Sequence, residues 1–423
     1  MDKRRVSTDR GIRGAALVGA VALAACADSG LGAEPNLEIG QVRQALGGAA
    51  LPGLTAAQNA LFLEGKDAFE EIEGLEDGLG PVFNEKACGN CHDQGATGGP
   101  GNQFEVRAGR LTGSTFDPLI AQGGQLFDLS SVMSLPGSDR QAIPNCTLGR
   151  DGEPVPANAN VVADRRTTGL FGLGLVDATP DSTFAALRAA QPPAIRGRVA
   201  MVFNIAANQL TMGKFGWKAQ VPTLHQFSGD AYLNEMGITN PEFPTEQPPL
   251  GNAALAGPCD VVPETATTFE DDGEDVDHFT DFMSFLAPIA PAAQNQAAAA
   301  GDVLFTQLGC AGCHTRSLTS GSNPVAALSN QTYHPFSDFL LHDMGSLGDN
   351  IGGNGDAGLR EMRTAPLWGL RTLNPNQLLH DGRAHSIADA IHLHDGQAAA
   401  ARNAFDALSG SDKDRVVAFL NTL

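Results

Sequence analysis

The chain has 423 residues, and its 27 Lys and Arg against 48 Asp and Glu give a net charge of −21. A chain this acidic is not expected to bind nucleic acid, because phosphate binding depends on clustered Lys and Arg. Hydrophobic residues make up 42% of the chain, which is enough for a buried core and too little for a polytopic membrane protein. The length predicts two domains.

Residues 1–25 have the composition of an export signal. Five basic residues within residues 3–13 precede an uncharged apolar run from Gly14 to Ala25. This run is too short to cross about 30 Å of hydrocarbon as a helix. It ends in a sequence similar to a bacterial lipobox, which predicts that Cys26 is lipidated and begins the mature chain. An ordinary secretory signal is the alternative, and residues 26–50 are predicted to be a tether.

Two segments, Cys88–His92 and Cys310–His314, have the form Cys-x-x-Cys-His. This is the attachment signature of a c-type haem, in which two thiols form thioether bonds with the porphyrin and the adjacent His binds the iron. Zinc sites or thioredoxin-like redox pairs are alternatives, but they leave each His without a role. We predict two covalently bound haem c groups. Their predicted attachment residues are Cys88, Cys91, Cys310 and Cys313, and their predicted iron ligands are His92 and His314.

Two further cysteines belong to no motif. Cys146 and Cys259 each lie in a loop-like setting, and in an oxidising compartment we predict a disulfide bond between them. The bond would close a loop of over a hundred residues and stabilise the fold by up to about 4–5 kcal/mol in the chain-entropy model. Two free thiols are the alternative.

The elements around the two haem motifs repeat. A helix-like segment with Gly and Phe four residues apart precedes each motif, and an amphipathic helix follows each. The positions are Gly65 and Phe69, then Phe279, Phe282, Met283 and Leu286; and Gly301 and Phe305, then Val416, Phe419, Leu420 and Leu423. This is the order of a class I cytochrome c domain. We predict a mainly α fold with two such domains, at residues 51–290 and 291–423, the first carrying long loop-rich insertions.

An acidic run, Glu270–Asp275, precedes the first of the two amphipathic helices. Negative charge is favourable at the N-terminus of a helix, and this is the simpler interpretation. A Ca²⁺ site is the alternative.

Several longer strings point to one family. They are residues 214–224, 235–239, 340–345, 363–370 and 380–383, which read KFGWKAQVPTL, EMGIT, LLHDMG, RTAPLWGL and HDGR. Together they resemble the bacterial di-haem oxidoreductase family of predicted thiol oxidoreductases, within the dihaem cytochrome c peroxidase and MauG superfamily. The resemblance covers about residues 55–423. Three positions depart from the family pattern: Gly95 replaces Pro, Glu235 replaces a more usual Asp, and Lys214 replaces Arg.

The resemblance implies roles for particular residues. His394, fourteen residues after His380, stands where the peroxidase relatives carry the distal ligand of the second haem; a surface His at a helix end is the alternative. Glu235 resembles the carboxylate that acts on peroxide at the first haem, where no distal ligand is evident. A solvated loop Glu, or iron ligation by Met236, are the alternatives. His342 is expected beside the haems or in ordinary packing.

We therefore expect an exported, peroxidase-like dihaem c-type oxidoreductase, in which one haem meets the oxidant and the other relays electrons. It would be anchored by the lipid on Cys26 to the periplasmic side of a bacterial cell envelope. Cleavage before Cys26 changes the net charge to −24, which would attract a small redox protein, donor or acceptor, with a basic patch. The alternative is a membrane-anchored electron-transfer dihaem cytochrome without peroxidase turnover. Thiol oxidation ranks lowest, because a Cys146–Cys259 bond would leave no free reactive cysteine.

Overall fold

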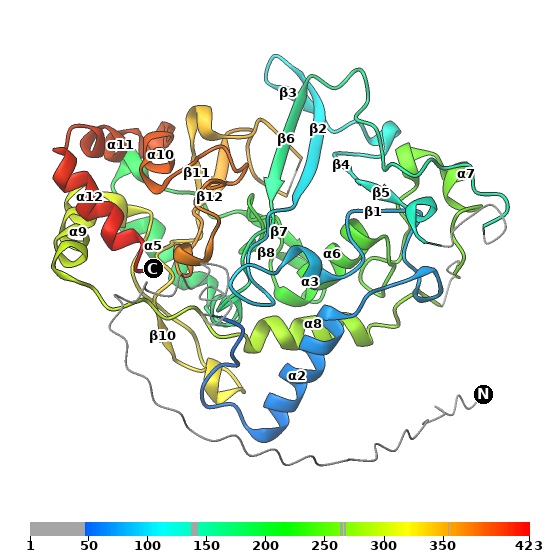
Figure 1. Cartoon of the computed structure of the whole chain (residues 1–423), viewed down its shortest axis with the longest axis horizontal. Coiled ribbons are helices and arrows are strands. Elements are labelled where there is room, and N and C mark those ends of the chain that lie inside the picture. Colours follow the sequence, from blue (N-terminus) through cyan, green and yellow to red (C-terminus); the bar gives the residue numbers. More distant parts are fainter. Residues whose placement is uncertain (1–46, 137–142, 263–264, 266–267, 354) are drawn as a thin grey trace, which may run out of the picture. The chain divides into compact units, whose positions relative to one another are not determined.

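The computed structural model describes residues 47–136, 143–262, 265, 268–353 and 355–423, so the predicted export signal and Cys26 lie outside the described residues. The helices are α2 Ala56–Glu70, α3 Cys88–Cys91, α4 Leu173–Asp177, α5 Asp181–Ala190, α6 Leu224–Met236, α7 Ala253–Ala256, α8 Glu274–Phe285, α9 Gln296–Gln307, α10 Ile387–His392, α11 Ala399–Asp406 and α12 Gly410–Leu420 (Figure 1). Within the part of the chain that is described, no helix is long and apolar enough to span a membrane.

Antiparallel strands form several small sheets. The strands are β1 Val82–Phe83, β2 Phe104–Thr112, β3 Thr115–Asp117, β4 Leu126–Phe127, β5 Ser130–Ser131, β6 Val161–Arg166, β7 Met201–Asn204, β8 Gln209–Met212, β9 Leu318–Thr319, β10 Thr332–Tyr333, β11 Leu341–Asp343 and β12 Glu361–Arg363. The long strand β2 pairs with β3, β4 and β6, and the other pairs are β1 with β5, β7 with β8, β9 with β10, and β11 with β12.

The prediction of a mainly α fold is wrong. Of the described residues, 36% are helical and 14% lie in strands, so the fold is mixed. Most of the strands have only two to four residues, and a run this short carries too little alternation of polar and apolar residues to be recognised. The domain limits at residues 51–290 and 291–423 stay a prediction. The described residues form one compact unit.

Each haem motif nevertheless follows a helix that crosses a later helix at a glycine. A Cβ on Gly65 in α2 would overlap the carbonyl oxygen of His278 in α8, and a Cβ on Gly301 in α9 would overlap that of Arg415 in α12. Glycine is therefore required at both crossings, because only its missing side chain lets the two backbones approach so closely. The order of helix, haem motif and helix thus occurs twice, with the predicted apolar face of each later helix buried.

The acidic run has a structural role at the start of α8. The carboxylate of Asp271 accepts hydrogen bonds from the backbone N–H groups of Gly273, Asp275 and Val276, at 3.0, 3.2 and 3.4 Å. These are N–H groups that a helix leaves without partners at its first turn. The simpler interpretation of the run is therefore supported, and calcium binding stays a prediction.

The predicted disulfide bond is present between Cys146 and Cys259, which are 113 positions apart and both buried. Replacing both cysteines with Ala is expected to lower the free energy of unfolding by about 2–5 kcal/mol, because the unfolded chain loses a crosslink that closes a long loop. Denaturant unfolding of the double variant measures this loss. Reductant should destabilise the wild type equally, since thioether bonds to haem resist reduction; a loss below about 1 kcal/mol in both measurements would contradict the prediction.

Candidate haem sites

The second Cys-x-x-Cys-His motif lies directly after α9 and presents His314 for metal binding. The Nδ1 of His314 donates a hydrogen bond to the carbonyl oxygen of Phe336 at 2.9 Å, which leaves Nε2 free. A backbone partner on the other ring nitrogen is the usual support of a metal-binding His, because it fixes the tautomer and the ring orientation. Burial lowers the pKa of His314 to about 4, so the ring is neutral and able to bind a metal.

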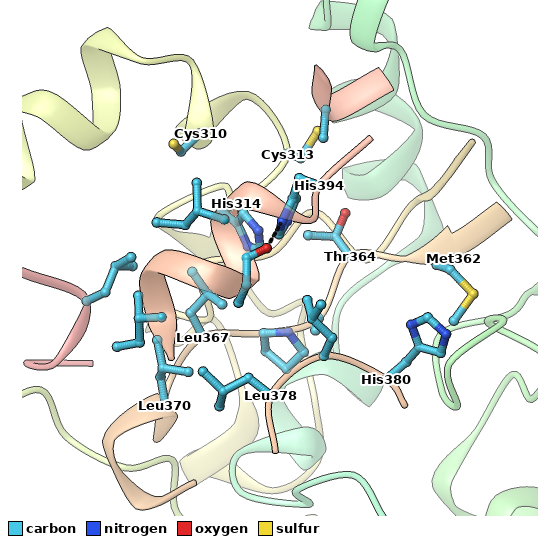
Figure 2. Close-up of a pocket in the computed structure, with 18 of the residues that line it drawn as sticks. Cys310, Cys313, His314, Met362, Thr364, Leu367, Leu370, Leu378, His380 and His394 are labelled. Carbon is cyan, nitrogen blue, oxygen red and sulfur yellow. Dashed lines mark hydrogen bonds between the residues drawn. The ribbon is translucent and has the colours of Figure 1, made fainter. Parts of the chain in front are cut away.

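His394 faces His314 across the same site (Figure 2). Its Nδ1 donates to the carbonyl oxygen of Ala390 at 2.7 Å, so its Nε2 is also free. The two ring centroids lie 6.4 Å apart. Two imidazoles that bind one metal at about 2 Å from each nitrogen have their centroids about 6 Å apart, so the spacing fits a single iron between them. His392, two residues earlier, points elsewhere and pairs with Asp406 on the surface.

A cavity of about 420 Å³ surrounds this pair, and its wall is mainly apolar. Cys310, Cys313, His314 and His394 all line it, together with apolar residues such as Leu367 and Leu378 (Figure 2). Ligand pockets in proteins typically have volumes of about 300–1,000 Å³ and predominantly apolar walls. A covalently bound haem with two imidazole ligands requires two thiols, two neutral imidazoles and an apolar cavity. The residues present therefore fit the second predicted haem.

The first motif shares two features with the second, a backbone partner for the His and an aromatic ring beside it. Cys88–Cys91 forms the short helix α3, and His92 donates from Nδ1 to the carbonyl oxygen of Gly99 at 3.2 Å. Burial lowers the pKa of His92 to about 4. The ring of Phe69 lies 5.8 Å from that of His92, as Phe305 lies 6.4 Å from His314. The predicted Gly–Phe pairs therefore place an aromatic ring beside each proximal His.

The backbone conformation of Gly95 explains why Gly rather than Pro stands at this position. Its φ is +86°, a backbone conformation that L residues rarely adopt and that the ring of Pro excludes, because it holds φ near −65°. The turn after His92 therefore differs from the one that a Pro at this position would make.

Glu235 lies near the first motif, at the C-terminal end of α6. Its Oε2 accepts a hydrogen bond from Asn84 Nδ2 at 2.7 Å. After burial, the negative charge of Glu235 is the next cause that raises the pKa of the Cys91 thiol. Burial, followed by the negative charge of Glu105, raises the pKa of Glu235 to about 8. Glu235 is thus a protonatable group beside the first haem motif rather than a solvated loop residue. The neighbouring Met236 packs in the hydrophobic core.

Two charged residues near Glu235 were not predicted from the sequence. Glu105 and Arg107 lie on β2 and point to the same face of the strand. Arg107 donates from Nε and Nη2 to the two carboxylate oxygens of Glu105, at 3.0 and 2.8 Å. In the sequence, the spacing of two residues between Glu105 and Arg107 indicates only that both side chains lie on the same face of a strand. It does not indicate that this face lies near Glu235.

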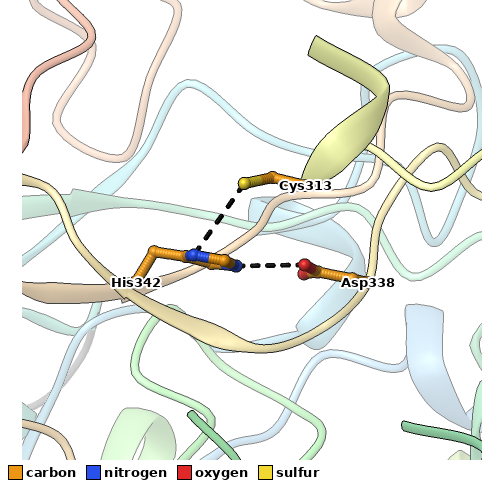
Figure 3. Close-up of side chains that lie close together, drawn as sticks. All are labelled: Cys313, Asp338 and His342. Atoms are coloured by element: carbon orange, nitrogen blue, oxygen red, sulfur yellow. Dashed lines mark hydrogen bonds and ion pairs between the residues drawn. The ribbon is translucent and has the colours of Figure 1, made fainter. Parts of the chain in front are cut away.

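His342, in β11, lies beside the second haem motif (Figure 3). Its Nδ1 is 3.8 Å from Cys313 Sγ, and its Nε2 is 3.0 Å from an oxygen of the buried Asp338. Burial lowers the pKa of His342, but the hydrogen bonds and charges of Asp338 and Cys313 together outweigh burial and raise the pKa to about 10. These three side chains are close enough to share a metal ion, although the predicted thioether bond would use Cys313.

Comparisons with known proteins agree with the di-haem assignment. A family model described as "Di-haem oxidoreductase, putative peroxidase" matches residues 157–423, which include Glu235, the second haem motif and His394 but not the first motif. No match was found among curated proteins. One similar solved structure is a Kuenenia stuttgartiensis hydrazine synthase pressurised with 20 bar xenon, with 13% identity and a TM-score of 0.37 over 97% of this chain and 100% of that chain. A TM-score this low supports no argument about function. Because the family match spans more than half of the sequence, we conclude that the chain belongs to the di-haem oxidoreductase family.

Proposed function

We propose that this oxidoreductase reduces peroxide at the first haem and receives the electrons through the second. The observation that carries the proposal is a difference between the two sites. His314 faces a second imidazole at 6.4 Å, whereas the group near the first motif is the carboxyl of Glu235. An iron held by two imidazoles has no position left for peroxide, but a proton-transferring carboxyl is what peroxide reduction needs.

The chemistry assigns a proton-transfer role to Glu235. Reduction of one peroxide molecule takes two electrons and two protons, breaks the O–O bond and forms two water molecules. A haem held by His92 would supply the electrons, and solvent would supply the two protons. Glu235 accepts the proton from one peroxide oxygen and delivers it to the departing oxygen, so its carboxylate form begins the reaction.

The electrons would come from outside the chain. We expect a small redox protein with a basic patch to deliver them, because a net charge near −24 after cleavage attracts such a partner. Lipidation of Cys26 would hold the enzyme at a membrane surface on the periplasmic side of the envelope, where c-type haem is attached. Cys26 lies outside the described residues, so this anchor rests on the sequence alone.

Electron paramagnetic resonance of the oxidised and half-reduced protein, with and without hydrogen peroxide, tests the proposal. We expect a low-spin signal from the haem between His314 and His394, and a high-spin signal from the haem at His92 in the reactive state. Peroxide should remove the high-spin signal only. Two low-spin signals in every redox state, unchanged by peroxide, would contradict the proposal and favour an electron-transfer cytochrome without turnover.

A further inference from the structure

Two guanidinium groups lie close to the carboxylate of Glu105. Arg107 binds both of its carboxylate oxygens, and Arg165 places Nη1 3.8 Å from Oε1. Arg165 is almost fully buried and is itself held by Asp349, with Nη2 at 2.7 Å from a carboxylate oxygen. A bidentate guanidinium and a second nearby one strongly favour an ionised carboxylate. Although burial opposes it, the charge of Arg107 lowers the pKa of Glu105.

Glu105 is also in hydrogen-bond contact with Glu235, which comes from a distant part of the chain. Two carboxylates cannot accept a hydrogen bond from each other, so a contact between them requires one proton, which the pair shares. The neighbours of each carboxyl group determine which of the two holds the proton. Glu105 accepts hydrogen bonds from a positively charged guanidinium group, whereas Glu235 accepts one from the neutral amide of Asn84, so the proton resides on Glu235.

We propose that Glu105, held by Arg107, is a positioning residue for the peroxide reaction: it keeps the shared proton on Glu235. This inference rests on the proposed function, and it explains how that site is regulated. Glu235 becomes a base only when the pair loses its proton to solvent. Peroxide reduction is therefore restricted to neutral and alkaline conditions by a residue that need not touch the peroxide.

The other titratable groups that face this pair do not supply the same effect. Asp128, between β4 and β5, has a pKa raised well above its usual value, by burial first and then by the charge of Glu235. Burial raises the pKa of Asp230, in α6, to about 6. It also raises the pKa of Glu153, which accepts a hydrogen bond from the backbone N–H of Asp128 rather than facing the pair itself. Of the carboxyl groups that face Glu235, Glu105 is the one with a lowered pKa and bidentate guanidinium contacts.

Glu105→Gln tests the inference, because it keeps the size of the side chain and removes its negative charge. The readout is the infrared absorption of the protonated Glu235 carboxyl, identified by its loss in Glu235→Gln and followed against pH in the haem-containing protein. We expect the wild type to lose this band around pH 8. In Glu105→Gln the loss should move to lower pH by about one unit or more, since a like charge has been removed. The pH profile of peroxide reduction should move with it.

Two controls separate this effect from general damage. Glu85→Gln also removes one negative charge near Cys91. Glu85 accepts a hydrogen bond from Asn90 rather than contacting Glu235, so this variant should leave the infrared band of Glu235 at the same pH. Glu105→Asp keeps the charge and should restore the alkaline transition. If Glu105→Gln does not fold, the double variant with Arg107→Gln removes both members of this partly buried ion pair and should shift the band in the same direction.

The outcomes are distinguishable. An unmoved band in Glu105→Gln, or an equal shift in Glu85→Gln, overturns the inference even if peroxide is reduced. A shifted band in a protein that reduces no peroxide supports the pairing of Glu105 with Glu235 and overturns the proposed function instead, because the infrared measurement does not depend on turnover.

Discussion

Replacing Glu235 with Gln is expected to lower the rate of peroxide reduction by about 100- to 10,000-fold, which is the usual contribution of a general acid–base group. Gln keeps the shape of the side chain and a hydrogen bond with Asn84, but it cannot accept and return a proton. Haem content and the optical spectrum of the second haem should not change. Stopped-flow measurement of the reduced protein with hydrogen peroxide gives the rate.

The pH dependence of the rate of peroxide reduction tests whether Glu235 is the group that accepts the proton. The pKa of Glu235 is raised to about 8, so its carboxylate form gains population as the pH rises through this value, and the wild-type rate should rise with it. The Glu235→Gln variant should lack this rise, and Glu85→Gln, which changes a charge near the same motif, should keep it. A full rate in Glu235→Gln, or a wild-type rate that falls through pH 8, would contradict the assignment.

Replacing His394 with Ala is expected to convert the second haem from a low-spin to a high-spin state. The ring centroids of His314 and His394 are 6.4 Å apart, so the variant removes one of the two imidazoles that face each other across the site. Electron paramagnetic resonance and optical spectra of the oxidised protein measure the change. His394→Met should restore a sixth ligand and raise the reduction potential, because His/Met ligation has a higher potential than two imidazoles.

His392 supplies the matched control for this prediction. It lies two residues away at the end of α10, and its ring pairs with Asp406 on the surface. His392→Ala should therefore leave both haem spectra as they are in the wild type. A low-spin second haem in His394→Ala would mean that another residue binds the iron, and the assignment of His394 would be wrong.

Local patterns in the sequence account for a large part of the haem sites. Each Cys-x-x-Cys-His motif is a contiguous run of five residues, so the motifs predict the attachment residues and proximal ligands without knowledge of the fold. The periodic apolar residues of α8 and α12 were also predicted, because a helix of about a dozen residues repeats its pattern several times. The family resemblance implied His394 as a ligand, through its spacing from His380 in the same short stretch of chain.

The sheets could not be predicted because their pairing is not local. Strand β2 pairs with β6, more than fifty residues later, and β1 with β5 joins segments of only two residues each. Such strands depend on their partners rather than on their own propensity. This is why segments expected to be loop-rich insertions contain the sheet that carries Glu105 and Arg107.

The amino-acid sequence by itself predicted the haem cofactors, their proximal ligands, the disulfide pair and the family, because each of these predictions depends on residue identity and short spacing. Only the tertiary structure decided which carboxyl groups meet. Glu105 and Glu235 are 130 positions apart, and neither their contact nor their partial burial can be obtained from the net charge of −21. The protonation of Glu235 depends on the few charges within hydrogen-bond reach in a buried site, and these are brought together by the fold.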